Sequence, residues 1–552
     1  MQAKPIGRER RRRAPGVRPP SLRWCRGHGQ RLNLLGGLLA TACMTIGSYA
    51  YAPMPTPPAL LRATPLGAAL TALRASDGAR TWGLVLCFTG VTVLTLAWFA
   101  LGVAVKNEES GVRRVTLTGL TWSVPLLLAP PMFSGDGWSY AAYGYLTGHD
   151  MSPYVVPPSV LHGPLIDAVC SCWRDTPAPY GPVPLLWGGA FSRFTASPWL
   201  LLAAYRLLAL LGLGMLMYAA PRLARIAGRH PARAAWLVAS PLVLAHGVGG
   251  VHLDLVMVGL VATALAFMFS LPSQTLPRRR ESARAMASGW FTGAVGIGLA
   301  TAVKAPAVVA GLGVALVALP REATTAARLR AGARVGFLAV GTTGVIGVLA
   351  GLGVGWLITI HATLVLHTPL SLTYDVGTWV SGLTGHNAAP VVDVIGIVVL
   401  IGACGVILCR SRTGEPGAAL GAAAVAMLLT TVLSPVTNYW YYLWCLPLLA
   451  CCRLPAWARR SLTALVGVLG LLAPLDPALH VPGTGNIQLA AALGAVLLAA
   501  GAPIARDLVD RAAKQSQTPP APAGRTAADA IGAPGGHTDV ADGVASRSRP
   551  LG

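Results

Sequence analysis

Residues 199–219 read WLLLAAYRLLALLGLGMLMYA, an apolar stretch whose only charged side chain is Arg206. A helix needs roughly 20 apolar residues, sometimes as few as 17, to cross the hydrocarbon core of a membrane. Similar stretches recur along nearly the whole chain. The sequence therefore predicts an all-α polytopic membrane protein with about 13–14 transmembrane helices. The predicted spans are 33–51, 82–105, 115–133, 199–219, 234–248, 252–271, 287–303, 305–319, 335–360, 391–409, 416–433, 439–452, 461–475 and 487–505.

The composition excludes several other classes of protein. Of 552 residues, 54% are hydrophobic and 11% are charged, whereas soluble domains carry about 25% charged residues. The net charge of +23 lies in short clusters between apolar runs, which is typical of membrane topology, so we expect no nucleic-acid partner. The cysteines show no zinc-ligand spacing, and an i, i+2 pair such as Cys170 and Cys172 is poorly placed to form a bridge. We therefore expect neither a metal site nor a disulfide framework.

The chain divides into three predicted regions. Residues 1–32 form a basic cytoplasmic tail, 33–505 the transmembrane domain, and the polar, Pro- and Gly-containing residues 506–552 a disordered cytoplasmic tail. Within the membrane domain, the run 183–197 is apolar but short and contains Arg193. We expect a re-entrant or interfacial helix there, because a span at this point would place the basic loop 220–233 outside.

The placement of Lys and Arg predicts the orientation in the inner membrane. Most loops on the side of the N-terminus are basic, whereas the regions 134–198, 361–390, 434–438 and 476–486 hold few basic residues. Because positive charge marks the cytoplasmic side, we expect these four regions to face outward. Loop 52–81 disagrees, since it carries three arginines on the predicted outer side.

The loop 134–182 is the first candidate for function. It combines four Asp residues with many Tyr, Trp, Gly and Pro residues, and long ordered loops are usually functional. Aromatic rings beside carboxylates suit a sugar, because the rings stack on its C–H faces and the carboxylates bind its hydroxyl groups. Asp136 follows a predicted span directly and suits a general base, whose basicity partial burial would raise. The alternative is a helix cap or an ordinary loop charge.

Other rare polar residues lie near the predicted outer surface. Arg206 and Lys304 suit contacts with an anionic lipid phosphate, with snorkelling or anchoring as alternatives. His252 and Asp254 open a span, where Asp254 suits either substrate contact or the helix dipole. Further aromatic candidates are Trp379, Tyr439 and Trp440, the last two being equally typical of an aromatic belt.

Several stretches resemble the MptA/MptB family of polyprenol-phosphomannose-dependent α-(1→6)-mannosyltransferases, of the GT-C class. They are DGWSYAAYGYLTGHDMSPY (136–154), PYGPVPLLW (179–187), HLDLVMVGL (252–260), VKAP (303–306) and SPVTNYWYYLW (434–444). The D-x-x-S-Y-A-A-x-G core with its following P-Y is the most specific of them. The chain departs from the family pattern at Leu253, where the family more often has Asn, and at Asn438 and Tyr439, where Pro or Gln is usual.

The resemblance implies a GT-C-like bundle with a functional extracytoplasmic loop and an inverting transfer of mannose. The donor would be a polyprenyl phosphomannose, and the acceptor an α-(1→6)-mannan or glycolipid of lipomannan and lipoarabinomannan assembly. Asp136 stands at the position of the catalytic base, and no cofactor is implied. We expect the substrate to be contacted by Tyr140, Tyr154, Tyr180, Arg206, His252, Asp254, Lys304, Trp379, Tyr439 and Trp440.

Two alternative hypotheses assign the chain to classes of protein other than enzymes. A transporter or flippase also has many spans and rare intramembrane charges, but it predicts internal repeats, and the sequence shows none. A structural partner in an envelope complex would leave the Asp136 loop unexplained. The absence of a P-loop and of a G-x-G-x-x-G within a βαβ unit argues against a nucleotide-sugar site and favours a lipid-linked donor.

Overall fold

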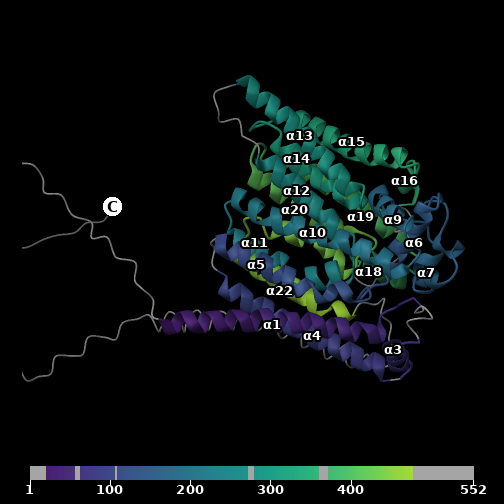
Figure 1. Ribbon diagram of the computed structural model, residues 1–552. Coiled ribbons are helices and arrows are strands. Elements are labelled where there is room, and N and C mark those ends of the chain that lie inside the picture. Colours follow the sequence, from purple (N-terminus) through teal and green to yellow (C-terminus); the bar gives the residue numbers. More distant parts are fainter. Residues whose placement is uncertain are drawn as a thin grey trace, which may run out of the picture. The chain divides into compact units, whose positions relative to one another are not determined.

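A computed structural model describes residues 20–55, 63–76, 78–105, 109–270, 279–359, 368 and 371–475. Every regular element in these ranges is a helix (Figure 1). The all-α membrane class predicted from the sequence is thereby confirmed. The predicted span 487–505 and the tail 506–552 lie outside the described residues, as does most of the tail 1–32.

Six helices are long and apolar enough to cross a membrane, counted over the described residues alone. One further bent pair, η3 (Val243–Gly249) and α12 (Asp254–Ser270), turns by 112° and meets the same test when taken together. The six are the apolar part of α1 (Pro20–Tyr51), α4 (Ala79–Ala104), α10 (Pro198–Ile226), α15 (Thr325–Leu349), α19 (Ala389–Arg410) and α20 (Pro416–Leu433).

Several predicted spans are broken into shorter pieces. Residues 115–133 contain the end of α5 (Glu109–Ser123) and η1 (Pro125–Leu128), and 439–452 contain η5 (Tyr439–Trp444) and α21 (Leu446–Leu449). Apolar composition marks these stretches as buried but does not reveal such breaks. The remaining bounds are α11 (Pro231–Val238), α13 (Arg279–Thr301), η4 (Ala305–Ala310), α14 (Gly311–Val317), α22 (Ala456–Leu471) and η6 (Ala473–Leu475).

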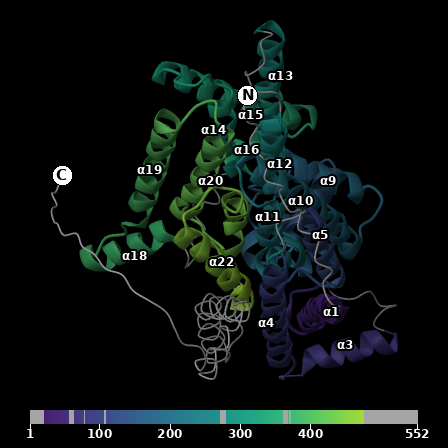
Figure 2. The same ribbon diagram turned by 90° about the vertical axis from the view of Figure 1, so that its left-hand side faces the viewer.

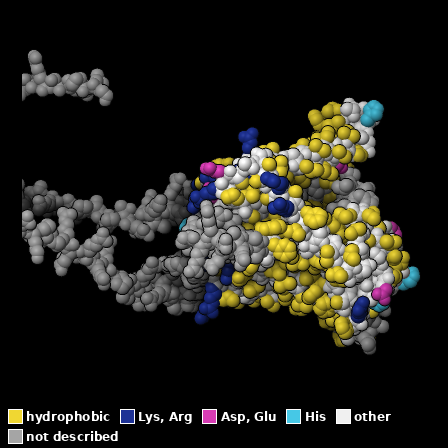
Figure 3. Space-filling model, turned by 90° about the horizontal axis from the view of Figure 1, so that it is seen from above, with side chains coloured by type: hydrophobic (Ala, Val, Ile, Leu, Met, Phe, Trp, Pro, Cys, Tyr) yellow, Lys and Arg dark blue, Asp and Glu magenta, His cyan; other side chains and the backbone are white. Residues whose placement is uncertain are grey.

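One end of the described bundle carries the loop segments predicted to face outward. They form α6 (Asp136–Gly148), η2 (Pro158–Val160), α7 (Pro164–Asp167), α8 (Ser171–Arg174), α9 (Pro182–Ser192) and α18 (Leu372–Thr384) (Figure 1). The same end also holds α3 (Pro65–Ala75) and α16 (Gly355–Thr359), of which α16 belongs to the predicted span 335–360. The 11-residue α9 is shorter than a span. Most of the Lys and Arg side chains visible in Figure 3 lie toward the opposite end, across a largely apolar surface.

Small residues allow α6 and α9 to pack closely against each other. A Cβ added to Gly144 of α6 would lie 2.7 Å from the Cα of Gly188 in α9, so neither position has room for a side chain. Elsewhere, Trp98 and Trp236 stack at 4.4 Å, and each indole N–H donates to the other residue's carbonyl. By contrast, α19 lies at the edge of the bundle beside α18 and α20 and is mostly exposed, as expected for a lipid-facing helix (Figure 2).

Candidate functional site

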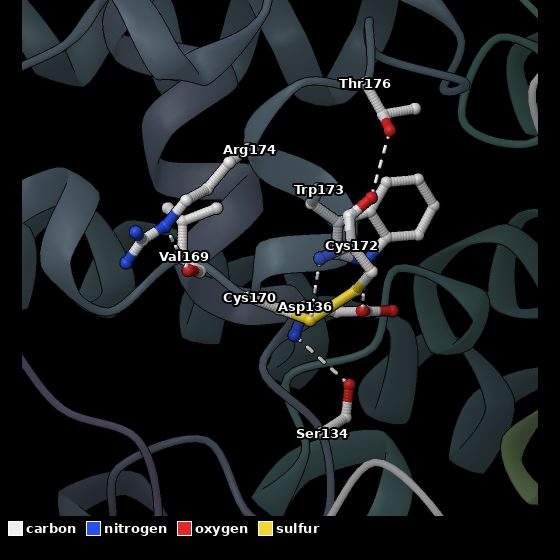
Figure 4. The surroundings of a disulfide bond; sticks show 8 residues. All are labelled: Ser134, Asp136, Val169, Cys170, Cys172, Trp173, Arg174 and Thr176. Atoms are coloured by element: carbon white, nitrogen blue, oxygen red, sulfur yellow. Dashed lines mark hydrogen bonds between the residues drawn. A yellow bond between two sulfur atoms is a disulfide. The ribbon is translucent and has the colours of Figure 1, made fainter.

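Asp136 is the first residue of α6 and is 8% exposed. Its Oδ1 accepts a hydrogen bond from Trp173 Nε1 at 3.1 Å (Figure 4). Its Oδ2 accepts one from the Tyr140 hydroxyl at 3.3 Å. Its backbone N–H donates to Ser134 Oγ at 3.1 Å. Burial raises the pKa of Asp136 above its ordinary value, while the Lys304 ammonium and the Trp173 hydrogen bond oppose that rise. The carboxyl is thus buried, hydrogen-bonded to neutral groups and more basic than an exposed aspartate.

A second carboxylate lies at the start of α12. Asp254 is fully buried and forms an ion pair with Lys304, whose Nζ lies 2.9 Å from Oδ1 and 3.1 Å from Oδ2. Trp444 Nε1 donates to the same Oδ1. Lys304 also lies 4.5 Å from the ring centroid of Tyr441 and 5.5 Å from that of Trp444. A cation whose side chain is only 12% exposed is therefore held between one carboxylate and two aromatic faces.

Tyr180 joins the two carboxylate regions. Its ring lies 5.1 Å from the Tyr140 ring and 5.9 Å from Lys304 Nζ, and its carbonyl accepts a hydrogen bond from the Tyr154 hydroxyl at 2.9 Å. The next residue, Gly181, donates its backbone N–H to the Val303 carbonyl at 3.2 Å. A Cβ at position 181 would lie 2.2 Å from the Ala302 carbonyl oxygen, so this close approach requires glycine. The end of the outer loop is thereby fixed to the segment that carries Lys304.

His252 and Trp440 form a stacked pair beside this region, with ring centroids 4.1 Å apart. His252 Nδ1 lies 2.7 Å from the His246 carbonyl, which fixes this nitrogen as the donor. Among the described residues, His252 Nε2 and Trp440 Nε1 are buried without a hydrogen-bond partner. The pair thus offers one acceptor and one donor. Tyr439 lies nearby, with its ring 6.2 Å from that of His246.

Two predicted site residues are not brought into this cluster. The buried guanidinium of Arg206 donates to the carbonyls of Leu126, Ala129 and Val248, which binds α10 to the irregular segments η1 and η3. Trp379 lies on α18 and is 67% exposed. Within the described ranges, none of the contacts that hold the cluster together reaches Trp379. The predictions for these two residues remain untested.

The structure corrects the expectation that Cys170 and Cys172 are poorly placed to form a bridge. Cys170 and Cys172 are bridged, with their Cα atoms 5.3 Å apart (Figure 4). An extended i, i+2 pair would be separated by about 6.6 Å, near the upper limit for a bridge. Here Cys170 is the N-cap of α8 and the chain turns into the helix, which shortens the separation.

Sequence reasoning missed Trp173 and Trp444, the two indoles that donate to the carboxylates. Trp444 lies inside the SPVTNYWYYLW stretch and could have been found there, whereas the short segment around Trp173 carries no comparable signal. As to metals, the described part of the chain contains no group of three or more His, Cys, Asp or Glu side chains that could hold an ion.

Comparison with known proteins identifies the family. The family model for the N-terminal domain of α-(1→6)-mannopyranosyltransferases of the MptA/MptB type matches residues 34–320, and that for the MptB C-terminal domain matches residues 367–502. The chain belongs to this family. It is therefore a multi-pass membrane glycosyltransferase, as the sequence predicted, and membership favours an enzyme over a transporter.

Individual relatives agree with the family match. A probable α-(1→6)-mannopyranosyltransferase of Mycolicibacterium smegmatis is 32% identical, over 71% of this chain and 75% of that protein. The α-(1→6)-mannopyranosyltransferase A of Mycobacterium tuberculosis is also 32% identical, over 70% and 73%. Among solved structures, ArnT from Cupriavidus metallidurans bound to undecaprenyl phosphate matches with a TM-score of 0.39 at 18% identity, over 72% of each chain.

Proposed function

We propose that this enzyme transfers mannose from a polyprenyl phosphomannose to an α-(1→6)-mannan or glycolipid acceptor at the outer face of the cytoplasmic membrane. The names of its relatives support the sugar and the linkage. The basic loops support an outward site, because the Asp136 region lies at the end of the bundle away from most of the arginines. The observation that carries the proposal is a buried carboxyl with neutral hydrogen-bond partners, joined through the Tyr180 ring to a largely buried lysine, Lys304.

In the proposed reaction Asp136 acts as the base. It takes the proton of an acceptor hydroxyl, whose oxygen forms a bond to the anomeric carbon as the bond from that carbon to the phosphate oxygen breaks. Attack on the face opposite the phosphate inverts the anomeric configuration. The polyprenyl phosphate leaves as an anion, so no general acid is needed. The raised pKa of Asp136 suits this role, since a more basic carboxylate accepts a proton more readily.

Lys304 is the proposed contact for the phosphate. An ammonium group has three N–H donors, and Asp254 accepts from Lys304 through two oxygens. A remaining donor and the positive charge suit a phosphate oxygen. The guanidinium of Arg206 is used by main-chain carbonyls, which favours Lys304 for this role.

His252 and Trp440 are proposed to bind one sugar hydroxyl. A hydroxyl group both donates and accepts, so it matches the acceptor at His252 Nε2 and the donor at Trp440 Nε1. Because both nitrogens are buried, a hydroxyl that satisfies them would be recognised strongly over a hydrogen atom at the same position.

The test is transfer by membranes that contain the protein, with radiolabelled polyprenyl phosphomannose and short α-(1→6)-mannoside acceptors. Wild type is compared with Asp136→Asn, which keeps the shape of the side chain but removes the base, and we expect a loss of about 10²–10⁴-fold. The matched control is Asp150→Asn, an exposed aspartate in the same loop at φ 59°, a conformation that Asn tolerates.

Retained transfer by Asp136→Asn would refute the role of Asp136 as base. Absence of transfer by the folded wild-type protein would reject the donor and acceptor pair, and other lipid-linked sugars would be tried next. If every lipid-linked sugar failed, uptake or flipping of the same lipids would be measured in vesicles.

A further inference from the structure

The short helix α8 lies against Asp136 and is fixed by contacts within its own loop. The bridge joins its N-cap, Cys170, to its second residue, Cys172, and the Cys172 N–H donates to Cys170 Sγ at 3.3 Å. Arg174 Nε donates to the Val169 carbonyl at 3.1 Å, and Thr176 Oγ1 donates to the Cys172 carbonyl at 2.9 Å (Figure 4). Trp173 stands between these contacts and is thereby restricted in orientation.

Trp173 connects this loop to Asp136. Its Nε1 donates to Asp136 Oδ1 at 3.1 Å, and its half-buried ring lies 6.3 Å from that of Tyr180. The bridge itself also reaches α6, because a Cβ added to Gly135 would lie 3.6 Å from Cys170 Cβ. The bridge and the indole therefore both lie at the N-terminus of α6.

We propose that the Cys170–Cys172 bridge makes Trp173 a positioning residue for Asp136. The indole N–H holds Oδ1 and fixes the rotamer of the carboxyl, which leaves Oδ2 and its partner Tyr140 to face the acceptor. This inference rests on the proposed role of Asp136 as base.

The bridge is better suited to this local task than to overall stability. It closes a loop between residues two apart, and on the chain-entropy account so short a loop restricts the unfolded chain little. Cys172 is exposed and Cys170 half-exposed, so a soluble thiol reaches the bridge. Oxidised cysteines are also expected at a site outside the cell.

The effect to measure is on protonation of Asp136. A hydrogen bond to the charged carboxylate favours that form, so removing it makes the group easier to protonate. Other groups act on the same carboxyl and stay in place in the variants described next. They are Lys304, Asp254, Tyr140, Tyr143, Tyr180 and Tyr441.

Two variants test the proposal in the transfer assay across pH. Trp173→Phe removes the N–H and keeps an aromatic ring, and the double variant C170S/C172S removes the bridge and keeps the indole. We expect the acid limb of the pH–rate profile to move to higher pH by roughly one unit in both, with most of the rate retained on the alkaline side. Dithiothreitol, which is oxidised to its cyclic disulfide as the bridge gains two thiol protons, should reproduce the shift in wild type and add nothing in C170S/C172S.

Trp187→Phe is the matched control, because that indole donates to a main-chain carbonyl, Ala204, outside the cluster. Its acid limb should stay where it is in wild type. A normal acid limb in Trp173→Phe, with Asp136→Asn inactive, would overturn the positioning role while Asp136 remained the base. If Trp173→Phe, C170S/C172S and the control Trp187→Phe all moved the acid limb equally, a general structural effect would replace the proposal.

Two measurements do not depend on transfer. Infrared difference spectra of wild type minus Asp136→Asn follow the protonated carboxyl of Asp136 during a pH titration without substrate. The same upward shift is expected in Trp173→Phe, and an unchanged titration would overturn the inference even if the enzyme used another donor. Alkylation of the denatured, unreduced protein should leave Cys170 and Cys172 unmodified; labelling of both would disprove the bridge.

Discussion

Asp136 and Asp254 are two buried carboxylates with similar backbone settings and different partners. Each is the first residue of a helix, each accepts a hydrogen bond from an indole, and each follows by three positions a non-glycine residue with positive φ, Phe133 at 64° or Val251 at 60°. Such backbone conformations are costly and cluster at functional sites. The difference lies in charge, because Asp254 is paired with Lys304, whereas the hydrogen-bond partners of Asp136 are neutral.

This difference separates two tasks. A carboxylate paired with a cation at 2.9 Å serves to hold that cation in place. A carboxylate with neutral partners in a buried setting is prepared to accept a proton. The comparison therefore supports the proposal that Asp136 accepts the proton and that Asp254 holds Lys304.

The largest predicted effect comes from removing the Lys304–Asp254 ion pair, first one partner at a time and then both together. Lys304→Met and Asp254→Asn each leave one buried charge uncompensated, which typically costs about 3–5 kcal/mol of folding free energy. The double variant removes both charges, so we expect its thermal stability in detergent to recover. Transfer should not recover, because no ammonium remains for the phosphate.

The double variant also provides the control, since it separates folding from catalysis. Recovery of transfer together with stability would show that the pair is purely structural and that another group contacts the phosphate. A double variant as unstable as the single ones would indicate that Trp444, which donates to the same carboxylate, requires the charge on Asp254.

A second prediction concerns pH and Asp136. Because the folded-state pKa of Asp136 is raised by burial, transfer should fall as pH decreases through a value above that of an exposed aspartate, with about a tenfold loss for each further pH unit. The contribution of Asp136 to folding stability depends on pH in the opposite direction to transfer. A raised carboxyl pKa stabilises the fold at low pH, and this stabilisation is lost as pH rises through the folded-state value.

At neutral pH the charged Asp136 thus costs stability, and Asp136→Asn should melt at the same temperature as wild type or higher. Thermal melting of the two proteins at pH 5 and pH 8 measures this. A clear loss of stability in Asp136→Asn at pH 8 would show that the carboxylate is a structural helix cap, the alternative considered from the sequence.

The sequence predicted the membrane class and named most of the residues that the structure brings together around Asp136 and Lys304. Asp136, Tyr140 and Tyr180 lie in motif stretches, and scarcity alone drew attention to Lys304, since charged residues are costly near hydrocarbon. The rarity of charged residues in the spans was less informative for Arg206. It draws attention to the guanidinium but does not reveal whether main-chain carbonyls or a ligand accept its hydrogen bonds. That distinction depends on where helices break, which apolar composition does not encode.

The Cys170–Cys172 bridge and the contact between Trp173 and Asp136 could not be predicted from the sequence, because both depend on how the loop folds. Whether Cys170 and Cys172 can join depends on a local turn, and whether Trp173 reaches Asp136 depends on how a loop 37 residues away in the chain folds back over α6. The family match extends over residues 34–320 but describes the kind of chemistry, not these contacts.

The smallest predicted effect concerns substrate selectivity, and it tests whether the residues around Asp254 also recognise the sugar. If His252 and Trp440 bind one sugar hydroxyl, wild type should reject a single member of a set of deoxymannosyl polyprenyl phosphates more strongly than the others. Trp440→Phe removes the donor and keeps a ring against His252, so discrimination against that one analogue should fall by about 3–10-fold while the others are unaffected. The ratios of kcat/KM between analogues measure this, because general damage to the enzyme cancels in a ratio.

Tyr442→Phe is the control, because Tyr442 is a half-buried tyrosine in the same helix η5. An equal change for every analogue would mean that Trp440 only packs against His252, and the polar residues at the break before Asp254 would then serve to hold Lys304 and not to read the sugar.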